Sequence, residues 1–199
     1  MVRIYIIRHG QTDANINFSC LGRNDIPLNE NGRTQSKALA ARLRDVTADK
    51  IYVSPLIRTK ETIKYYIDEH KTIPVITAPE LIERDFGEWE NLTFAQIREL
   101  DKEAFESWQS DQINYTVPGG ESSGQVQERI NSFFDRITKE NENKTIFIVA
   151  HLGTARHSIS RLLRLRPEES WRFTMFNATY AVIDYDNTTE CGVLKYLNS

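Results

Sequence analysis

The segment MVRIYIIRHG, residues 1–10, contains a short apolar run at residues 4–7 that is rich in β-branched side chains and is followed by Arg8, His9 and Gly10. Residues 51–53 in KIYVS and residues 146–149 in TIFIVAH form runs of the same kind. Such runs are typical of strands that are buried on both faces of a parallel sheet. The sequence therefore predicts three buried strands, at residues 4–7, 51–53 and 146–149.

Helical patterns follow these strands. Asn29 is placed to cap a helix that runs to about Arg44. Ser54 and Pro55 predict an N-cap followed by proline at the first helical position, so that Arg58 lies in the first turn of the next helix. Thr93 and Gln96 have the spacing of a capping box, and they predict a helix over residues 94–110. The face of that helix is expected to consist of Ile97, Leu100, Ala104 and Trp108.

The remaining periodic segments complete an α/β pattern. Apolar residues recur with helical spacing after Ser122 and again between His151 and Pro167. Residues 181–185 and 193–197 flank an Asp-Asn-Thr-Thr turn and predict a β-hairpin. We therefore expect a three-layer α/β/α sandwich with a mostly parallel sheet and an antiparallel strand near the C-terminus, formed by residues 1–199 as a single domain.

The composition is that of an ordinary globular protein. Hydrophobic residues make up 40% and charged residues 27% of the chain. The net charge of −3 gives no electrostatic reason to expect a nucleic-acid partner. No stretch has transmembrane length and no signal peptide is evident, so no membrane partner is predicted. Two cysteines, Cys20 and Cys191, are expected to be reduced thiols in a cytoplasmic protein. The sequence predicts no particular oligomeric state.

Residues suited to phosphate chemistry follow all three predicted strands. Arg8 and His9 follow the first, Ser54 to Arg58 follows the second, and His151 follows the third. Because ligands of open α/β sheets bind at the carboxyl ends of the strands, we expect these side chains to meet in one crevice. Guanidinium groups match phosphate oxygens, and a neutral imidazole offers a nitrogen nucleophile. The set predicts phosphoryl transfer.

Two further roles are suggested by position. Asn15 lies in the loop after Gly10 and could add a neutral donor to the phosphate site. A departing alkoxide also needs a proton, which a carboxyl group could supply. Glu83 is the candidate, but Glu80, Asp85, Glu88 and Glu90 lie close to it in the sequence. The residues alone leave that choice open.

In combination these motifs resemble the histidine phosphatase superfamily, in the branch that includes cofactor-dependent phosphoglycerate mutases and small broad-specificity phosphatases. The resemblance covers almost the whole chain in the expected order. It is carried by Arg8-His9-Gly10-Gln11-Thr12 with Asn15, Asp25-Ile26-Pro27-Leu28 before Gly32, Ser54-Pro55-Leu56-Ile57-Arg58-Thr59, Leu81-Ile82-Glu83 with Gly87 and Trp89, Pro118-Gly119-Gly120-Glu121-Ser122, and Val149-Ala150-His151.

The resemblance implies a phosphoglycerate mutase-like fold and a role for each site residue. His9 would be the nucleophile, and Glu83 would be the proton donor. The phosphoryl group would be held by Arg8, Arg58 and His151, with Asn15 as a further contact. Leu152 stands where the family often has glycine after the second histidine, and it retains a backbone N–H for phosphate. We therefore expect a phosphomonoester hydrolase that acts through a phosphohistidine on His9 and releases phosphate from a small phosphorylated metabolite.

Other uses of the same residues are less well supported. No HxH, HExxH or cysteine pair completes a metal site around His9 and His151, and no glycine-rich nucleotide loop is present, so neither a metal nor a cofactor is predicted. His70 and His157 are given no role. A cofactor-dependent phosphoglycerate mutase and a non-catalytic phosphate-binding module remain the alternative functions.

Phosphatase and mutase differ in what the pocket must hold. Mutases of the family carry a longer, arginine-bearing insertion before the Gly-Gly-Glu-Ser motif, which retains a product with a second anion. Here residues 88–117 form a short acidic segment, which is expected to repel a second anion and to favour bulky or uncharged leaving groups. Its charged residues are Glu88, Glu90, Arg98, Glu99, Asp101, Lys102, Glu103, Glu106 and Asp111.

Overall fold

The computed structural model describes residues 1–199 and contains one six-stranded sheet with the strand order β3-β2-β4-β1-β5-β6. The strand β5 runs antiparallel to both of its neighbours, β1 and β6, and all other pairings are parallel, so the predicted mostly parallel sheet with an antiparallel strand near the C-terminus is confirmed. The strands are β1 (Val2–Arg8), β2 (Lys50–Val53), β3 (Val75–Thr77), β4 (Thr145–Ala150), β5 (Tyr180–Asp186) and β6 (Cys191–Tyr196).

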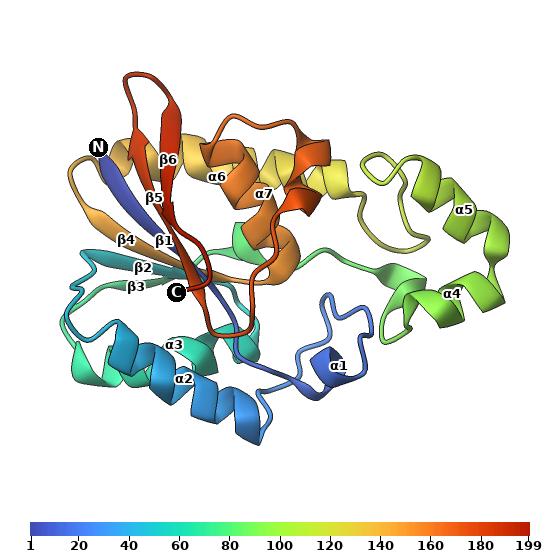
Figure 1. Ribbon diagram of the computed structural model, residues 1–199, viewed down its shortest axis with the longest axis horizontal. Helices are drawn as coiled ribbons and strands as arrows, with labels where there is room; N and C mark the ends of the chain where they lie inside the picture. Colours follow the sequence, from blue (N-terminus) through green and yellow to red (C-terminus); the bar gives the residue numbers. More distant parts are fainter.

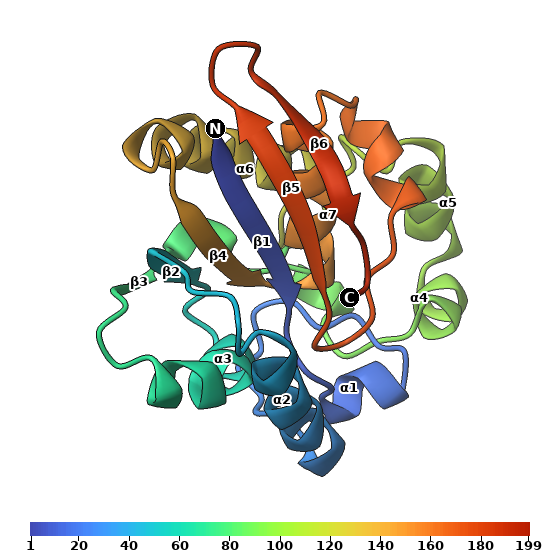
Figure 2. The same cartoon turned by 60° about the vertical axis from the view of Figure 1, so that its left-hand side comes forward.

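Helices cover both faces of the sheet, which confirms the expected three-layer sandwich. The helices α2 (Glu30–Arg42) and α3 (Ile57–Glu69) lie on one face, and α6 (Ser123–Glu140) and α7 (Leu152–Leu162) lie on the other (Figures 1 and 2). The shorter helices are α1 (Asp13–Ile16), α4 (Phe94–Leu100), α5 (Lys102–Ser110) and the 3-10 turns η1 (Pro79–Leu81), η2 (Gly87–Trp89) and η3 (Pro167–Arg172).

The central strand β1 explains why its sequence is a continuous apolar run. Ile4 and Ile6 pack with the core beneath α6 and α7, whereas Tyr5 and Ile7 pack with the core beneath α2 and α3. Side chains of a strand alternate between its faces, so a strand covered on both faces needs apolar residues at every position. The layers also place the carboxyl ends of β1, β2 and β4 side by side.

The segment with α4 and α5 lies beyond the carboxyl end of the sheet (Figure 1). Its own apolar cluster includes Trp89, Ile97 and Trp108. The capping box of Thr93 and Gln96 is confirmed, but the single helix predicted over residues 94–110 is wrong. The chain breaks at Asp101, whose Oδ1 accepts from the backbone N of Ala104 at 2.9 Å and caps α5.

Two other local predictions have different outcomes. The cap at Asn29 is confirmed, because its side chain accepts from the backbone N of Gly32 at 2.8 Å. The cap predicted at Ser54 is wrong, because α3 begins only at Ile57 and Ser54 contacts His151 instead. The exposed strand β3 lies in no predicted element. No helix is both long and apolar enough to cross a membrane, and Cys20 and Cys191 are not joined in a disulfide.

Candidate active site

The register of the sheet brings the predicted site residues together. Arg8 pairs with Ala150 and Val53 pairs with Val149, so His9, Ser54 and His151 follow three adjacent strands. The ring centroids of His9 and His151 are 5.2 Å apart. Because the carboxyl ends of adjacent parallel strands lie at the same edge of the sheet, these residues border the same crevice, as expected for ligand sites of open sheets.

The ring of His9 is held in one tautomer. Its Nδ1 lies 2.7 Å from the carbonyl oxygen of Gly10, which can only accept, so Nδ1 carries the proton and donates. The other ring nitrogen, Nε2, is therefore unprotonated in the neutral ring. Burial, followed by the charges of Arg58 and Arg8, holds the pKa of His9 well below its usual value of 6.5. His9 is thus a neutral imidazole with a free lone pair at neutral pH.

His151 is fully buried and both of its ring nitrogens are engaged. The Nε of Arg58 donates to Nδ1 at 3.2 Å, and the hydroxyl of Ser54 lies 2.8 Å from Nε2. Since Arg58 can only donate, His151 Nδ1 accepts and Nε2–H donates to Ser54. Burial and the charge of Arg58 lower the pKa of His151 well below 6.5. The second histidine is therefore also neutral.

Arg58 is buried behind the two histidines rather than on the pocket surface. Besides its contact with His151, its Nη1 donates to the carbonyl oxygen of Asn24 at 2.8 Å and its Nη2 to that of Gly22 at 2.7 Å. The guanidinium therefore links the second strand end to the loop that follows α1. Its positive charge acts on both imidazoles from within the protein.

Arg8 and Asn15 both line the pocket. The Nη1 of Arg8 donates to the carbonyl oxygen of Met175 at 2.5 Å, whereas its buried Nε has no protein partner. Burial lowers the pKa of Arg8 to about 10. The Oδ1 of Asn15 accepts from the backbone N of Thr12 at 3.0 Å and from Asn177 Nδ2 at 3.1 Å, which leaves the Nδ2 of Asn15 as a donor for the pocket.

Glu83 is the carboxyl group of the pocket lining. Its Oε1 accepts from the backbone N of Arg84 at 2.9 Å, and its Oε2 accepts from the backbone N of Gly153 at 3.0 Å. Leu152, the first residue of α7, lines the same pocket, and N–H groups of a first helical turn have no partner within the helix. The acid and these donors therefore face one space with His9.

That space is a cavity of about 490 Å³ lined by both polar and aromatic side chains. The lining contains three guanidinium groups, those of Arg8, Arg84 and Arg156, against the one carboxyl group of Glu83. Large aromatic side chains form much of the rest of the wall. They are Phe18, Phe86, Trp89, Phe94, Trp108 and Trp171.

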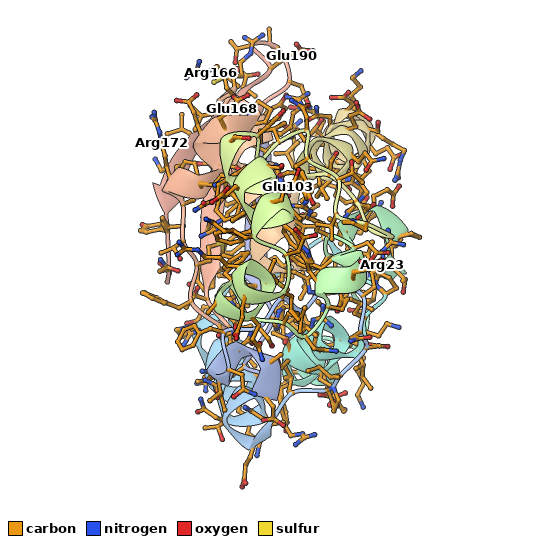
Figure 3. The ribbon with its side chains drawn as sticks, turned by 90° about the vertical axis from the view of Figure 1, so that its right-hand side faces the viewer. Arg23, Glu103, Arg166, Glu168, Arg172 and Glu190 are labelled. Atoms are coloured by element: carbon orange, nitrogen blue, oxygen red, sulfur yellow. The ribbon has the colours of Figure 1, made fainter.

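The repulsion predicted from the acidic segment of residues 88–117 has no support in the cavity wall, because none of the carboxylates of the segment lines the cavity. Glu90 is half-buried, and its Oε1 accepts from the backbone N of Arg23 at 3.0 Å, in a neighbouring loop. The other carboxylates of the segment are exposed to solvent. Glu103, for example, lies on the outside of α5 (Figure 3). Solvent screens exposed charges, so the cavity is governed by its own arginines.

Several contacts of the site were not predicted from the sequence. Asn177 donates to the carbonyl oxygen of His9 at 3.1 Å as well as to Asn15. His157 is buried beside the cavity, with Nε2 at 2.9 Å from Ser123 Oγ. Burial lowers its pKa to about 4, so it is neutral. Arg156 follows His151 by five residues on α7, and only that helical position could have indicated it.

Comparison with known proteins identifies the family. The model of the histidine phosphatase superfamily (branch 1) matches residues 4–198. The adenosylcobalamin/alpha-ribazole phosphatase of Salmonella typhimurium is 30% identical over 198 residues, which are 100% of this chain and 96% of that protein. Phosphoserine phosphatase 1 of Hydrogenobacter thermophilus is 33% identical over 183 residues, 92% of this chain and 86% of that protein.

Solved structures agree with these sequence matches. The alpha-ribazole phosphatase of Shigella flexneri has a TM-score of 0.91 at 29% identity, covering 99% of this chain and 96% of that chain. The phosphoserine phosphatase of Entamoeba histolytica, solved in complex with 3-phosphoglyceric acid, has a TM-score of 0.87 at 27% identity, covering 100% and 98%. The chain therefore belongs to branch 1 of the histidine phosphatase superfamily, and it is a phosphomonoester hydrolase of that family.

Proposed function

We propose that the protein hydrolyses phosphomonoesters through a phosphohistidine formed on Nε2 of His9. The contact between His9 Nδ1 and the carbonyl oxygen of Gly10, 2.7 Å long, is the observation that carries this proposal. It fixes the tautomer whose Nε2 lone pair can attack phosphorus. The lowered pKa of His9 supports the same role, because the ring stays unprotonated at neutral pH.

In the first step, Nε2 of His9 bonds to phosphorus while the bond from phosphorus to the ester oxygen breaks. Glu83 donates its proton to that oxygen, and the alcohol leaves. Arg8, Asn15 and Leu152 line the pocket, which supports a role for the guanidinium, the Asn15 Nδ2 and the Leu152 backbone N–H in stabilising the phosphoryl oxygens. In the second step, Glu83 takes a proton from water, the water oxygen bonds to phosphorus, and inorganic phosphate leaves the neutral imidazole.

Arg58 and His151 contribute from behind the nucleophile. A negatively charged phosphoryl oxygen competes with His151 Nδ1 for the Nε–H of Arg58, because hydrogen bonds to charged acceptors are stronger. Ser54 can either accept from or donate to His151 Nε2, since a hydroxyl does both. The change requires the other tautomer of the ring, in which Nε2 has given up its proton and Nδ1 has taken one, so that the ring stays neutral. In that tautomer Ser54 donates to Nε2, and His151 Nδ1–H is a donor for the phosphoryl group. The contacts at 3.2 Å and 2.8 Å support this exchange.

The substrate is proposed to be a small phosphorylated metabolite, and the reaction is proposed to need neither a metal nor a cofactor. No group of three or more His, Cys, Asp or Glu side chains is arranged to hold a metal ion, and the arginines supply positive charge. The unpaired Cys20 and Cys191 support a cytoplasmic location. The single sheet, built from both halves of the chain, supports one domain over residues 1–199.

The test compares the wild-type protein with His9→Ala on a panel of phosphomonoesters, with released phosphate and acid-labile phosphoenzyme as readouts. We expect both to be lost in His9→Ala. The matched control is His70→Ala, because His70 lies at the end of α3 farthest from the strand ends and packs on Tyr66. Undiminished hydrolysis by His9→Ala would exclude the proposed nucleophile. A wild-type protein that binds phosphate but forms no phosphoenzyme would favour a non-catalytic phosphate-binding module.

A further inference from the structure

Arg156 is held firmly in the wall of the cavity, yet its guanidinium forms no salt bridge. Its Nε donates to the carbonyl oxygen of Phe173 at 2.6 Å, and its guanidinium carbon lies 4.8 Å from the ring centroid of Trp171. Neither Nη1 nor Nη2 has a hydrogen-bond partner, and no carboxylate lies within salt-bridge distance. A half-buried cation fixed at its inner end thus presents two donors to the cavity.

Arg84 makes a useful comparison because it lines the same cavity and uses its donors differently. Its Nε donates to the carbonyl oxygen of Glu121 at 2.8 Å and its Nη2 to that of Tyr115 at 3.2 Å. Those two bonds tie the loop that carries Glu83 to the segment before α6. Arg84 therefore has a structural use, whereas the outer nitrogens of Arg156 have none.

The charges around the cavity do not balance with a phosphate group alone. Arg8, Arg84 and Arg156 line the wall, Glu83 is the one carboxyl group beside them, and both active-site histidines are neutral. Arg58, which does not line the wall, is offset by the nearby carboxylates of Asp25 and Glu90. Glu83 must be protonated when the leaving group departs. A phosphate dianion therefore offsets only part of the positive charge. Buried cations are costly unless they are paired, so a further negative charge in the cavity is favoured.

The position of Arg156 favours the leaving-group end of the cavity. Arg156 lies three residues after Gly153 on α7, and the backbone N of Gly153 donates to Glu83 Oε2 at 3.0 Å. Arg156 also lines the same cavity as Arg8 and Glu83. Arg156 is therefore close to both the phosphate-binding arginine and the proton donor. A group bound there would belong to the part of the substrate that leaves with the proton from Glu83.

We infer that Arg156 is the specificity-determining residue of an anion subsite, and that it binds a carboxylate on the leaving group of the substrate. This inference rests on the proposed function of the site. A carboxylate fits because the two Nη groups form a planar pair of donors that matches its two oxygens. The preferred substrates are then small phosphorylated carboxylic acids rather than esters of uncharged alcohols.

The test uses a matched pair of esters, 3-phosphoglycerate and sn-glycerol 3-phosphate, which differ in a carboxylate against a hydroxymethyl group. We expect wild-type kcat/KM to favour 3-phosphoglycerate by about 10- to 100-fold, the value of a charge-assisted bond. Arg156→Gln should abolish that preference, because kcat/KM should fall by about 10- to 100-fold more on 3-phosphoglycerate than on glycerol 3-phosphate, and Arg156→Lys should restore part of the preference. The control is Arg172→Gln, because Arg172 is exposed, pairs with Glu169 at 3.0 Å and lies outside the cavity (Figure 3).

Binding separates this inference from the proposed function. In a His9→Ala background, calorimetry should show tighter binding of 3-phosphoglycerate than of glycerol 3-phosphate, and addition of Arg156→Gln should remove the difference. Equal affinities for the two esters in the His9→Ala protein, or an equal fall in kcat/KM for both esters in Arg156→Gln, would overturn the inference of a carboxylate subsite. Neither result would contradict the proposed hydrolysis. Absence of turnover of both esters by the wild-type protein, with the affinity difference retained in His9→Ala, would instead contradict the proposed hydrolysis.

Discussion

Replacement of Gly153 by alanine should impair proton donation by Glu83 without unfolding the protein. A Cβ at position 153 would lie 2.5 Å from Glu83 Oε1, whereas ordinary contacts begin at 3.4 Å, so the carboxyl group must move by about 1 Å. Misplacement of a reacting group by that distance costs up to roughly 100-fold in rate. The helix itself gains from the change, because alanine is favoured over glycine within α7 by about 1 kcal/mol.

Two substrates distinguish this effect from general damage. An alkyl phosphate needs a proton for its leaving alkoxide, whereas p-nitrophenolate leaves without one. We expect kcat/KM of Gly153→Ala to fall by about 100-fold on glycerol 3-phosphate and by less than about 10-fold on p-nitrophenyl phosphate. Gly124→Ala is the control, since its Cβ would have its nearest contact at 3.4 Å. Equal losses on both substrates, or no loss, would refute the assignment of Glu83 as proton donor.

Three further outcomes follow from the site. Because burial and the charges of Arg58 and Arg8 hold the pKa of His9 well below 6.5, kcat/KM calculated for the substrate dianion should not decline through a midpoint near 6.5 as the pH falls from 7 to 5.5. A midpoint that remains after correction for the second ionisation of the substrate would contradict the neutral nucleophile. Ser54→Ala should lower kcat by roughly 3- to 10-fold at unchanged melting temperature, measured against Ser158→Ala, and full activity would show that the contact with His151 is not used. EDTA should leave phosphate release unchanged while vanadate inhibits, whereas strict dependence on a divalent metal would exclude charge neutralisation by side chains.

The parts of the fold that were predicted correctly have strong local causes. The central strands lie under helices on both faces, so burial makes them apolar at every position, and that pattern is visible without any partner. The cap of α2 at Asn29 and the capping box of α4 at Thr93 satisfy free backbone N–H groups within a few residues. Convergence at the strand ends then followed from the general rule for ligand sites in open sheets.

The parts that were predicted wrongly depend on contacts between distant segments. Ser54 has the chemistry of an N-cap, but His151, 97 residues away, takes its hydroxyl, and α3 starts later. Asp101 lies inside an amphipathic pattern, yet its side chain caps a new helix there and leaves Leu100 72% exposed. In each case a polar side chain had two competing partners, and local spacing does not show which one tertiary packing favours.

The charge of the cavity is another property that local sequence does not show. The acidic residues of α4 and α5 lie on the same two helices that supply Phe94 and Trp108 to the wall of the cavity. An amphipathic helix, however, turns its apolar face inward and its charged face to solvent. The carboxylates that dominate the sequence of this segment are therefore the ones that the substrate does not meet. The arginines that line the cavity come from three separate segments. Arg8 belongs to β1, Arg84 to the loop after η1, and Arg156 to α7. Local net charge thus predicted an anion-repelling pocket, while the distribution of side chains between faces produces an anion-attracting one.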